Sequence, residues 1–117
     1  MFHYGFNFQW MYHWEPGVVP QAADERALDC MVEWGFDFVR LPTSYWFWTT
    51  DFDYLRPDEK MLAHIDRYLA ACQARELHLS LNMHRVPGYC INGNEREKHN
   101  LWLDKEAQDG FVFQWEM

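Results

Sequence analysis

The 117 residues include 10 Lys and Arg against 18 Asp and Glu, a formal net charge of −8, and 49% of them are hydrophobic. Such an apolar fraction indicates globular rather than disordered material, and the length suits one small domain or part of a larger one. The acidic balance argues against nucleic acid and against an anionic membrane surface as partners, because the field of the chain repels phosphate.

The sequence predicts neither a membrane-spanning segment, nor a signal peptide, nor a full set of disulfides. No apolar run approaches the ~20 residues that cross a bilayer. The first ten residues, MFHYGFNFQW, lack the basic region and the small-residue cleavage site of a signal peptide. A mature secreted chain would share these features, so the compartment stays open. Cys30, Cys72 and Cys90 cannot all pair with one another, and we expect reduced thiols.

The first part of the chain alternates between strand and helix periodicity. Residues 2–8, FHYGFNF, repeat aromatic side chains with a period near two and predict a strand. Residues 21–34 carry apolar side chains at helical spacing and predict a helix, which Gly35 ends as a C′ residue. Residues 36–42, FDFVRLP, predict a second strand that stops at Pro42.

The remainder continues the same alternation. Pro57, Asp58 and Glu59 have the chemistry of a helix N-terminus and predict a second helix. Its apolar stripe consists of Met61, Ile65, Tyr68, Leu69 and Cys72. Residues 77–84, LHLSLNMH, predict a third strand, and Asp104 is positioned to cap a third helix.

Three strand–helix repeats with short connections predict right-handed βαβ units on a parallel sheet. A doubly wound sheet that binds a dinucleotide would need a glycine-rich turn after its first strand, and FNFQWMYHWEPG has none. The strand-to-helix loops are long and aromatic, whereas the helix-to-strand links GF and REL are very short. This asymmetry favours a barrel, whose function lies in the loops after the strands. We therefore expect an α/β chain that forms the first three βα units of an incomplete (β/α)8 TIM barrel, with residues 1–117 as a single region.

Two polar side chains mark the carboxyl ends of adjacent strands. In residues 77–84 the leucines suit the helix-facing side, so His84 ends an inward-facing polar row of His78, Ser80, Asn82 and His84. The same alternation in residues 36–42 places Arg40 inward, near the same rim. Because burial of an unpaired guanidinium costs several kcal/mol, we expect a carboxylate or anionic group close to Arg40. Either residue alone is compatible with a structural role; the two together favour a ligand site.

Aromatic residues crowd the loops at this rim, in segments 10–17 (WMYHWEPG) and 44–54 (SYWFWTTDFDY). Flat rings stack on the C–H face of a pyranose, and neighbouring amides and carboxylates bind its hydroxyl groups. The cluster therefore favours binding of a neutral sugar, with Trp14 and Trp46 as candidates, although many of these rings have the alternative role of packing loops onto the sheet.

A retaining glycosidase needs two carboxylates ~5–5.5 Å apart, and the sequence offers no obvious pair. Glu59, Glu95, Glu97 and Glu106 have polar surroundings, and we expect them to be solvated. Glu15 is placed to line the cleft but has no mate.

Metal ligands are also absent from the pattern. His84, Cys90 and His99 lack the tight spacing of a metal motif, so we expect neither a metal nor a cofactor.

Several segments together resemble glycoside hydrolase family 5, which contains many cellulases and endo-β-glucanases. The matching stretches are GFNF in the first strand, ERALDCMVEWGFDFVRLP running into GFDFVRLPTSYWFW, and LHLSLNMHRVPG in the third strand. The resemblance covers almost the whole chain. It implies a (β/α)8 barrel and retaining hydrolysis of β-linked glucans or mannans.

The resemblance also implies roles for individual residues. Arg40, in the V-R-L-P strand, would hold the catalytic nucleophile ionised and oriented. His84, in the H-x-x-P-G turn, would lie beside the sugar next to the cleaved bond. Arg85 stands where some members carry a second histidine, and we include it with Trp14 and Trp46 among the residues expected to contact substrate.

The main departure from the family is length, since a full barrel needs ~250 residues. The family's acid/base Glu ends the fourth strand and its nucleophile Glu ends the seventh, so we expect both beyond Met117. Glu15–Pro16 imitates the family's Asn-Glu-Pro motif on the wrong strand. The implied partners are a β-glucan or related oligosaccharide and the missing C-terminal part of the barrel.

Two other interpretations stay open at this point: a non-catalytic carbohydrate-binding or assembly fragment, and an unrelated α/β domain in which Arg40 and His84 serve only structure. Unpaired edges of a three-unit sheet further predict an isolated chain that is marginally stable or associates with itself.

Overall fold

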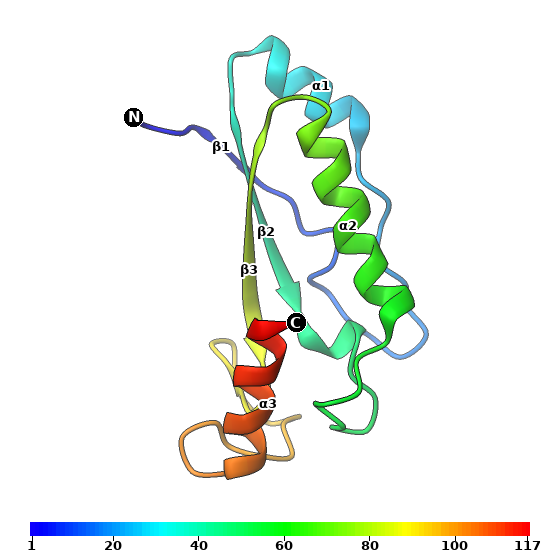
Figure 1. Cartoon of the computed structure of the whole chain (residues 1–117), viewed down its shortest axis with the longest axis vertical. Helices are drawn as coiled ribbons and strands as arrows, with labels where there is room; N and C mark the ends of the chain where they lie inside the picture. Colours follow the sequence, from blue (N-terminus) through cyan, green and yellow to red (C-terminus); the bar gives the residue numbers. More distant parts are fainter.

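The chain folds around one curled sheet, seen in a computed structural model that describes residues 1–117 (Figure 1). The strands, in the sheet order β1-β2-β3-β4, are β1 (Gly5–Asn7), β2 (Phe38–Ser44), β3 (His78–Val86) and β4 (Tyr89–Cys90). The helices are α1 (Glu25–Glu33), the 3-10 helix η1 (Tyr45–Phe47), α2 (Glu59–Gln73) and α3 (Lys105–Glu116). Strands β1, β2 and β3 are parallel, which confirms the predicted α/β chain of three βα units from a TIM barrel.

Side-chain caps set where the helices begin. Asp24 accepts a hydrogen bond from the Ala27 N–H, so α1 starts after Asp24 and not at residue 21 as predicted. Asp58 accepts from two N–H groups in the first turn of α2, as its position predicted. Gly35 has φ +83°, the left-handed conformation expected of a residue just past a helix end. Asp104 precedes α3, but its side chain accepts from the Asn100 N–H and caps nothing within α3.

The first two strands differ from their predicted bounds. β1 is limited to Gly5–Asn7 and does not span residues 2–8. β2 continues through Pro42 to Ser44, so the prediction that Pro42 ends the strand is wrong. Phe38 donates its N–H to the carbonyl of Tyr4, on the β1 side of the strand. Because the N–H groups of alternate residues in a strand point the same way, position 42 also faces β1. Because β1 ends at Asn7, which pairs with Arg40, the missing N–H of Pro42 removes no hydrogen bond from the β1–β2 ladder.

The third strand is longer than predicted and turns back on itself. β3 extends past His84 to Val86, and Pro87 and Gly88 form a two-residue turn into β4. Pro at the first central position and a glycine with φ +76° at the second are the signature of a type II turn. The alternation of residues 77–84 did not predict this hairpin.

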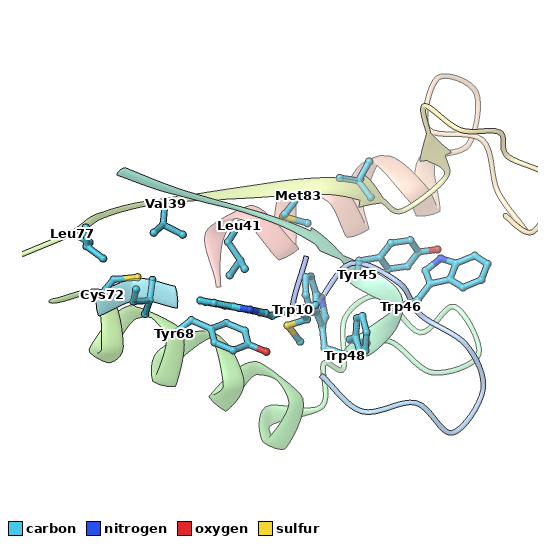
Figure 2. Packing of buried hydrophobic residues seen from close by; sticks show 14 of the residues in the cluster. Trp10, Val39, Leu41, Tyr45, Trp46, Trp48, Tyr68, Cys72, Leu77 and Met83 are labelled. Carbon is cyan, nitrogen blue, oxygen red and sulfur yellow. The ribbon is translucent and has the colours of Figure 1, made fainter. Parts of the chain in front are cut away.

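One hydrophobic core fills the space between the sheet and the helices, which lie on one side of it (Figure 1). Val39 and Leu41 are fully buried and point from β2 toward Tyr68 and Cys72 of α2 (Figure 2). Leu69 was predicted in the buried stripe of α2 but is 40% exposed. The three cysteines are free thiols. None of the helices combines the length and the apolarity that crossing a bilayer demands.

Candidate functional site

A polar row lies on the face of the sheet opposite the core. The register places Arg40 of β2 beside Asn7 of β1 and Ser80 of β3. The Arg40 guanidinium donates from Nη2 to Asn82 Oδ1 at 2.8 Å and from Nη1 to Asn7 Oδ1 at 3.4 Å. No ion pair of the chain includes Arg40, so neutral amides hold it where the sequence predicted an anionic partner.

His84 reaches the same amide oxygen. Its Nδ1 lies 3.3 Å from Asn82 Oδ1, and because an amide oxygen only accepts, Nδ1 carries the hydrogen. The two residues predicted to share a rim, Arg40 and His84, are therefore joined through Asn82. Sequence reasoning placed Asn82 in the inward row but missed it as a site residue; its spacing of two from His84 was the available signal.

A β-bulge positions the end of β3. Thr43 pairs with Met83 and the next residue, Ser44, pairs with Arg85, so His84 is the extra residue of the bulge. Bulges re-aim side chains and are common beside active sites. After the bulge, the Arg85 guanidinium lies 5.2 Å from the centroid of the Trp46 ring, within cation–π range.

The predicted aromatic candidates also meet at this end of the sheet. The Trp14 and Trp46 rings pack edge to face with centroids 5.2 Å apart. Both rings line two hollows, one of ≈ 390 Å³ that also touches Asp51 and one of ≈ 180 Å³ that also touches Arg85. Trp46 is only 9% exposed, so it supports its neighbours more than it presents an open stacking face.

Most other rings of segment 44–54 belong to the core. Tyr45, Trp48 and Tyr54 are 1%, 2% and 4% exposed, and Figure 2 shows Tyr45 and Trp48 within the packed hydrophobic cluster. For these rings the packing role, which the sequence left open, is the correct one.

Glu97 corrects a prediction, since it is not a solvated carboxylate. Its two oxygens accept from Tyr45 Oη at 2.6 Å and from Trp46 Nε1 at 3.1 Å, and the Gly88 N–H donates to it at 3.3 Å. Burial, and then the hydrogen bond to Glu97, raise the pKa of Tyr45, which keeps the hydroxyl a donor. The polar neighbours of Glu97 in sequence gave no sign of partners that lie far away along the chain.

No three His, Cys, Asp or Glu side chains gather in a way that would hold a metal ion. Cys90 is 3% exposed, and His99 Nδ1 lies 2.8 Å from the hydroxyl of Tyr54. The arrangement is instead that of an arginine, a histidine and aromatic rings around an open sheet face.

Comparison with known proteins identifies the family. The sequence model of the cellulase family, glycosyl hydrolase family 5, matches residues 3–113. The chain belongs to this family. A crystal structure of a glycoside hydrolase superimposes on 99% of this chain with a TM-score of 0.96 and 60% sequence identity.

Two curated relatives align with most of the chain. Endoglucanase C of Acetivibrio thermocellus is 35% identical over 91 residues, 78% of this chain and 26% of that protein. Cellodextrinase A of Ruminococcus flavefaciens is 28% identical over 92 residues, 79% of this chain and 26% of that protein. The chain therefore spans about a quarter of these relatives, and 35% of the glycoside hydrolase of known structure.

Proposed function

We propose that the chain forms the N-terminal part of the catalytic barrel of a retaining glycoside hydrolase that cleaves a cellulose-type β-glucan. Family membership and the endoglucanase and cellodextrinase names of its relatives support the substrate class. The observation that carries the proposal is the Arg40–Asn82–His84 row on a sheet face that no helix of the chain covers.

Arg40 is the residue that we assign to the nucleophile. Its guanidinium has five donors, of which the amide oxygens of Asn7 and Asn82 take two, and no carboxylate of the chain contacts it. A carboxylate brought to the remaining donors would be held ionised, because a nearby cation lowers the pKa of an acid. Arg40 then acts as a positioning residue for a nucleophile Glu supplied by the rest of the barrel.

Substrate contacts are assigned to the neighbours of Arg40. His84 would lie beside the sugar next to the cleaved bond, with Nδ1 committed to Asn82 and Nε2 left for a hydroxyl group. Trp14 and Arg85 would border the adjacent sugars, and Trp46 would hold both in place through its ring contacts.

Both catalytic carboxylates are assigned to chain beyond the three βα units. In a retaining enzyme one carboxylate attacks the sugar and the other first protonates the leaving oxygen and then activates water. Glu15 is occupied by an ion pair with Arg96 at 3.7 Å and fills neither role. The partners required are thus a β-glucan and the remaining C-terminal part of the barrel.

The test compares the chain alone with the chain joined to the rest of its barrel, by release of reducing sugar from a soluble β-glucan. Only the complete barrel should be active, and Arg40→Ala should lower kcat by about 10²-fold or more. His84→Ala should cost about 10²-fold through misplacement of the sugar. Hydrolysis by the chain alone, or near-normal rates in both variants, would contradict the proposal.

A pH profile separates the role of Arg40 from mere structural support. Loss of the guanidinium should raise the pKa of the nucleophile, so the acid limb of kcat/KM should move to higher pH in Arg40→Ala and less in Arg40→Lys. Arg26→Ala, on the exposed surface of α1, is the matched control and should leave the profile unchanged. If the chain binds glucan but the complete barrel does not hydrolyse it, the alternative of a non-catalytic carbohydrate-binding fragment is correct.

A further inference from the structure

Two arginines beside the aromatic pair lack the partners that a structural arginine has. The guanidinium carbons of Arg85 and Arg96 lie 5.2 and 4.9 Å from the centroid of the Trp46 ring. The Arg85 side chain makes neither an ion pair nor a hydrogen bond, although the residue is partly buried. Arg96 has one ion pair, with Glu15 at 3.7 Å, and that carboxylate is 72% exposed. Their donors are therefore largely unused.

Arg75 shows what a structural arginine looks like in the same chain. Its Nε donates to Asp29 at 2.7 Å, and its Nη1 donates to the Ala71 carbonyl at 2.9 Å. A second carboxylate, that of Glu25, lies 3.4 Å away. Arg85 and Arg96 have no such set, even though the chain carries a net charge of −8. One unpaired guanidinium and a second that has only an exposed carboxylate as its partner, both on one ring, form a local attraction for an anion.

The hollow of ≈ 180 Å³ brings these arginines to the proposed sugar cleft. Trp14, Trp46, Arg85 and Arg96 all line it. Tyr12 lines it too, and its ring contacts that of His84 with centroids 5.3 Å apart. Glu95 and Glu97 flank Arg96 in sequence, and neither forms an ion pair with Arg85 or Arg96. The carboxylate of Glu97 is taken by Tyr45, Trp46 and the Gly88 N–H. The hollow thus has aromatic walls and two arginines against one carboxylate, Glu15, and it lies next to the site through the contact of Tyr12 with His84.

We propose that this hollow is a subsite for an acidic sugar, in which Arg85 and Arg96 bind the carboxylate of a uronic acid unit on the glycan. The inference rests on the proposed function and adds to the glucan cleft a subsite for glycans that also carry uronic acid units. A guanidinium fork matches the geometry of a carboxylate, and the Trp14 ring supplies an apolar wall for the pyranose. Glu15 is the internal carboxylate that the ligand displaces from Arg96.

The experiment titrates the complete barrel with methyl β-D-glucuronide and with methyl β-D-glucoside, followed by tryptophan fluorescence. These ligands differ only in a carboxylate against a hydroxymethyl group, so the ratio of their Kd values isolates the contribution of the charge. The glucuronide should bind about tenfold more tightly, a free-energy difference of about 1.4 kcal/mol. Arg85→Gln and Arg96→Gln should each lower the ratio, and the double variant should bring it close to 1. High salt should lower it as well.

Glu15→Gln separates ligand recognition from structural support. Removal of the internal carboxylate frees Arg96, so the preference for the glucuronide should increase. If the Glu15–Arg96 pair has a purely structural role, the preference should stay the same or decrease. Arg26→Gln removes the same charge from α1 and should leave the ratio unchanged.

The outcomes distinguish this inference from the proposed function. A complete barrel that hydrolyses neutral β-glucan with a ratio near 1 would overturn the acidic subsite alone. A ratio near ten that the arginine variants abolish would support the subsite, even in a barrel that cleaves no glucan. A ratio that neither arginine variant changes would overturn it.

Discussion

At the scale of single residues, Glu97 holds together the two loops that border the site. It lies after β4, yet its carboxylate accepts from Tyr45 and Trp46, which follow β2, and from the Gly88 N–H in the turn after β3. Tyr45 is 1% exposed, so its hydroxyl has no access to water as an alternative acceptor. A buried donor left without a partner costs about 1–3 kcal/mol.

Glu97→Ala should therefore lower the free energy of unfolding by about 2–3 kcal/mol, because hydrogen bonds to a charged acceptor are stronger than neutral ones. The measurement is urea unfolding of the complete barrel with the m-value held constant. Glu95→Ala is the matched control, since Glu95 is exposed, and should change stability by less than about 0.5 kcal/mol. Equal effects of the two substitutions would show that Glu97 is no more than a surface residue.

Buried tyrosines make the fold sensitive to alkaline pH. Burial raises the pKa of Tyr54 and of Tyr68 to about 12, against an ordinary value of 10. The folded state thus keeps a proton that the unfolded state loses, and the resulting stabilisation is complete below pH 10 and is lost as pH rises toward about 12. Ultraviolet titration should show these two phenols ionising together with unfolding near the top of that window. The Tyr68→Phe variant should show one fewer phenol ionising near pH 12. An unchanged number of phenols ionising there would contradict the assignment.

At the scale of elements, the Pro87–Gly88 turn joins the site to α3. The Gly88 carbonyl accepts from the Leu101 N–H at 3.1 Å, and a Cβ at position 88 would lie 2.5 Å from that nitrogen. The turn therefore requires glycine both for its positive φ and for the close approach of residue 101.

Gly88→Ala should destabilise the protein more than Gly35→Ala. Both residues have a positive φ, +76° and +83°, but a Cβ at position 35 meets nothing within 4 Å. Gly35→Ala measures the backbone cost alone, about 1–2 kcal/mol, and the excess at position 88 measures the overlap with Leu101. Melting temperatures of the two variants provide the comparison, and equal values would show that the chain around Leu101 relaxes freely.

The elements that sequence predicted well are those with local signals. Asp58 at the start of α2 and Gly35 after the end of α1 are local signals of helix ends. The alternation of side chains along β3 likewise placed Asn82 and His84 on one face of the sheet. Pro42 was misjudged because its tolerance depends on where β1 stops, which is a property of the neighbouring strand. Glu97 was misjudged for the same reason, since its partners are distant in sequence. Local sequence patterns therefore predict helices, strands and the faces of their side chains. Contacts between loops that are distant in sequence become visible only in the tertiary structure.

At the scale of the whole molecule, the sheet is covered on one face only. The chain measures 46 × 31 × 24 Å with a radius of gyration of 15.3 Å. A compact domain of this length has a radius of about 13 Å, so the chain is more extended than a closed fold. Leu81 of β3 is 40% exposed, and Trp115 of α3 is 51% exposed, around a hollow of ≈ 290 Å³ between α2, β3 and α3. This surface is where we expect the remaining barrel to pack.

The isolated chain should accordingly associate with itself. Apart from its short pairing with β4, β3 has a free edge, and unpaired edges beside apolar side chains are templates for pairing with a second copy. Sedimentation velocity over a range of concentrations should show masses above the 14.3 kDa monomer.

Leu81→Lys places a charge beside that edge and should shift the distribution toward monomer, with circular dichroism to verify that helix content is kept. Leu55→Lys, in a loop where Leu55 is 55% exposed, is the control and should not. A monomer at every concentration with a sharp reversible melt would mean that this half-barrel is stable with its edge open, and the remaining barrel would then be needed for catalysis alone.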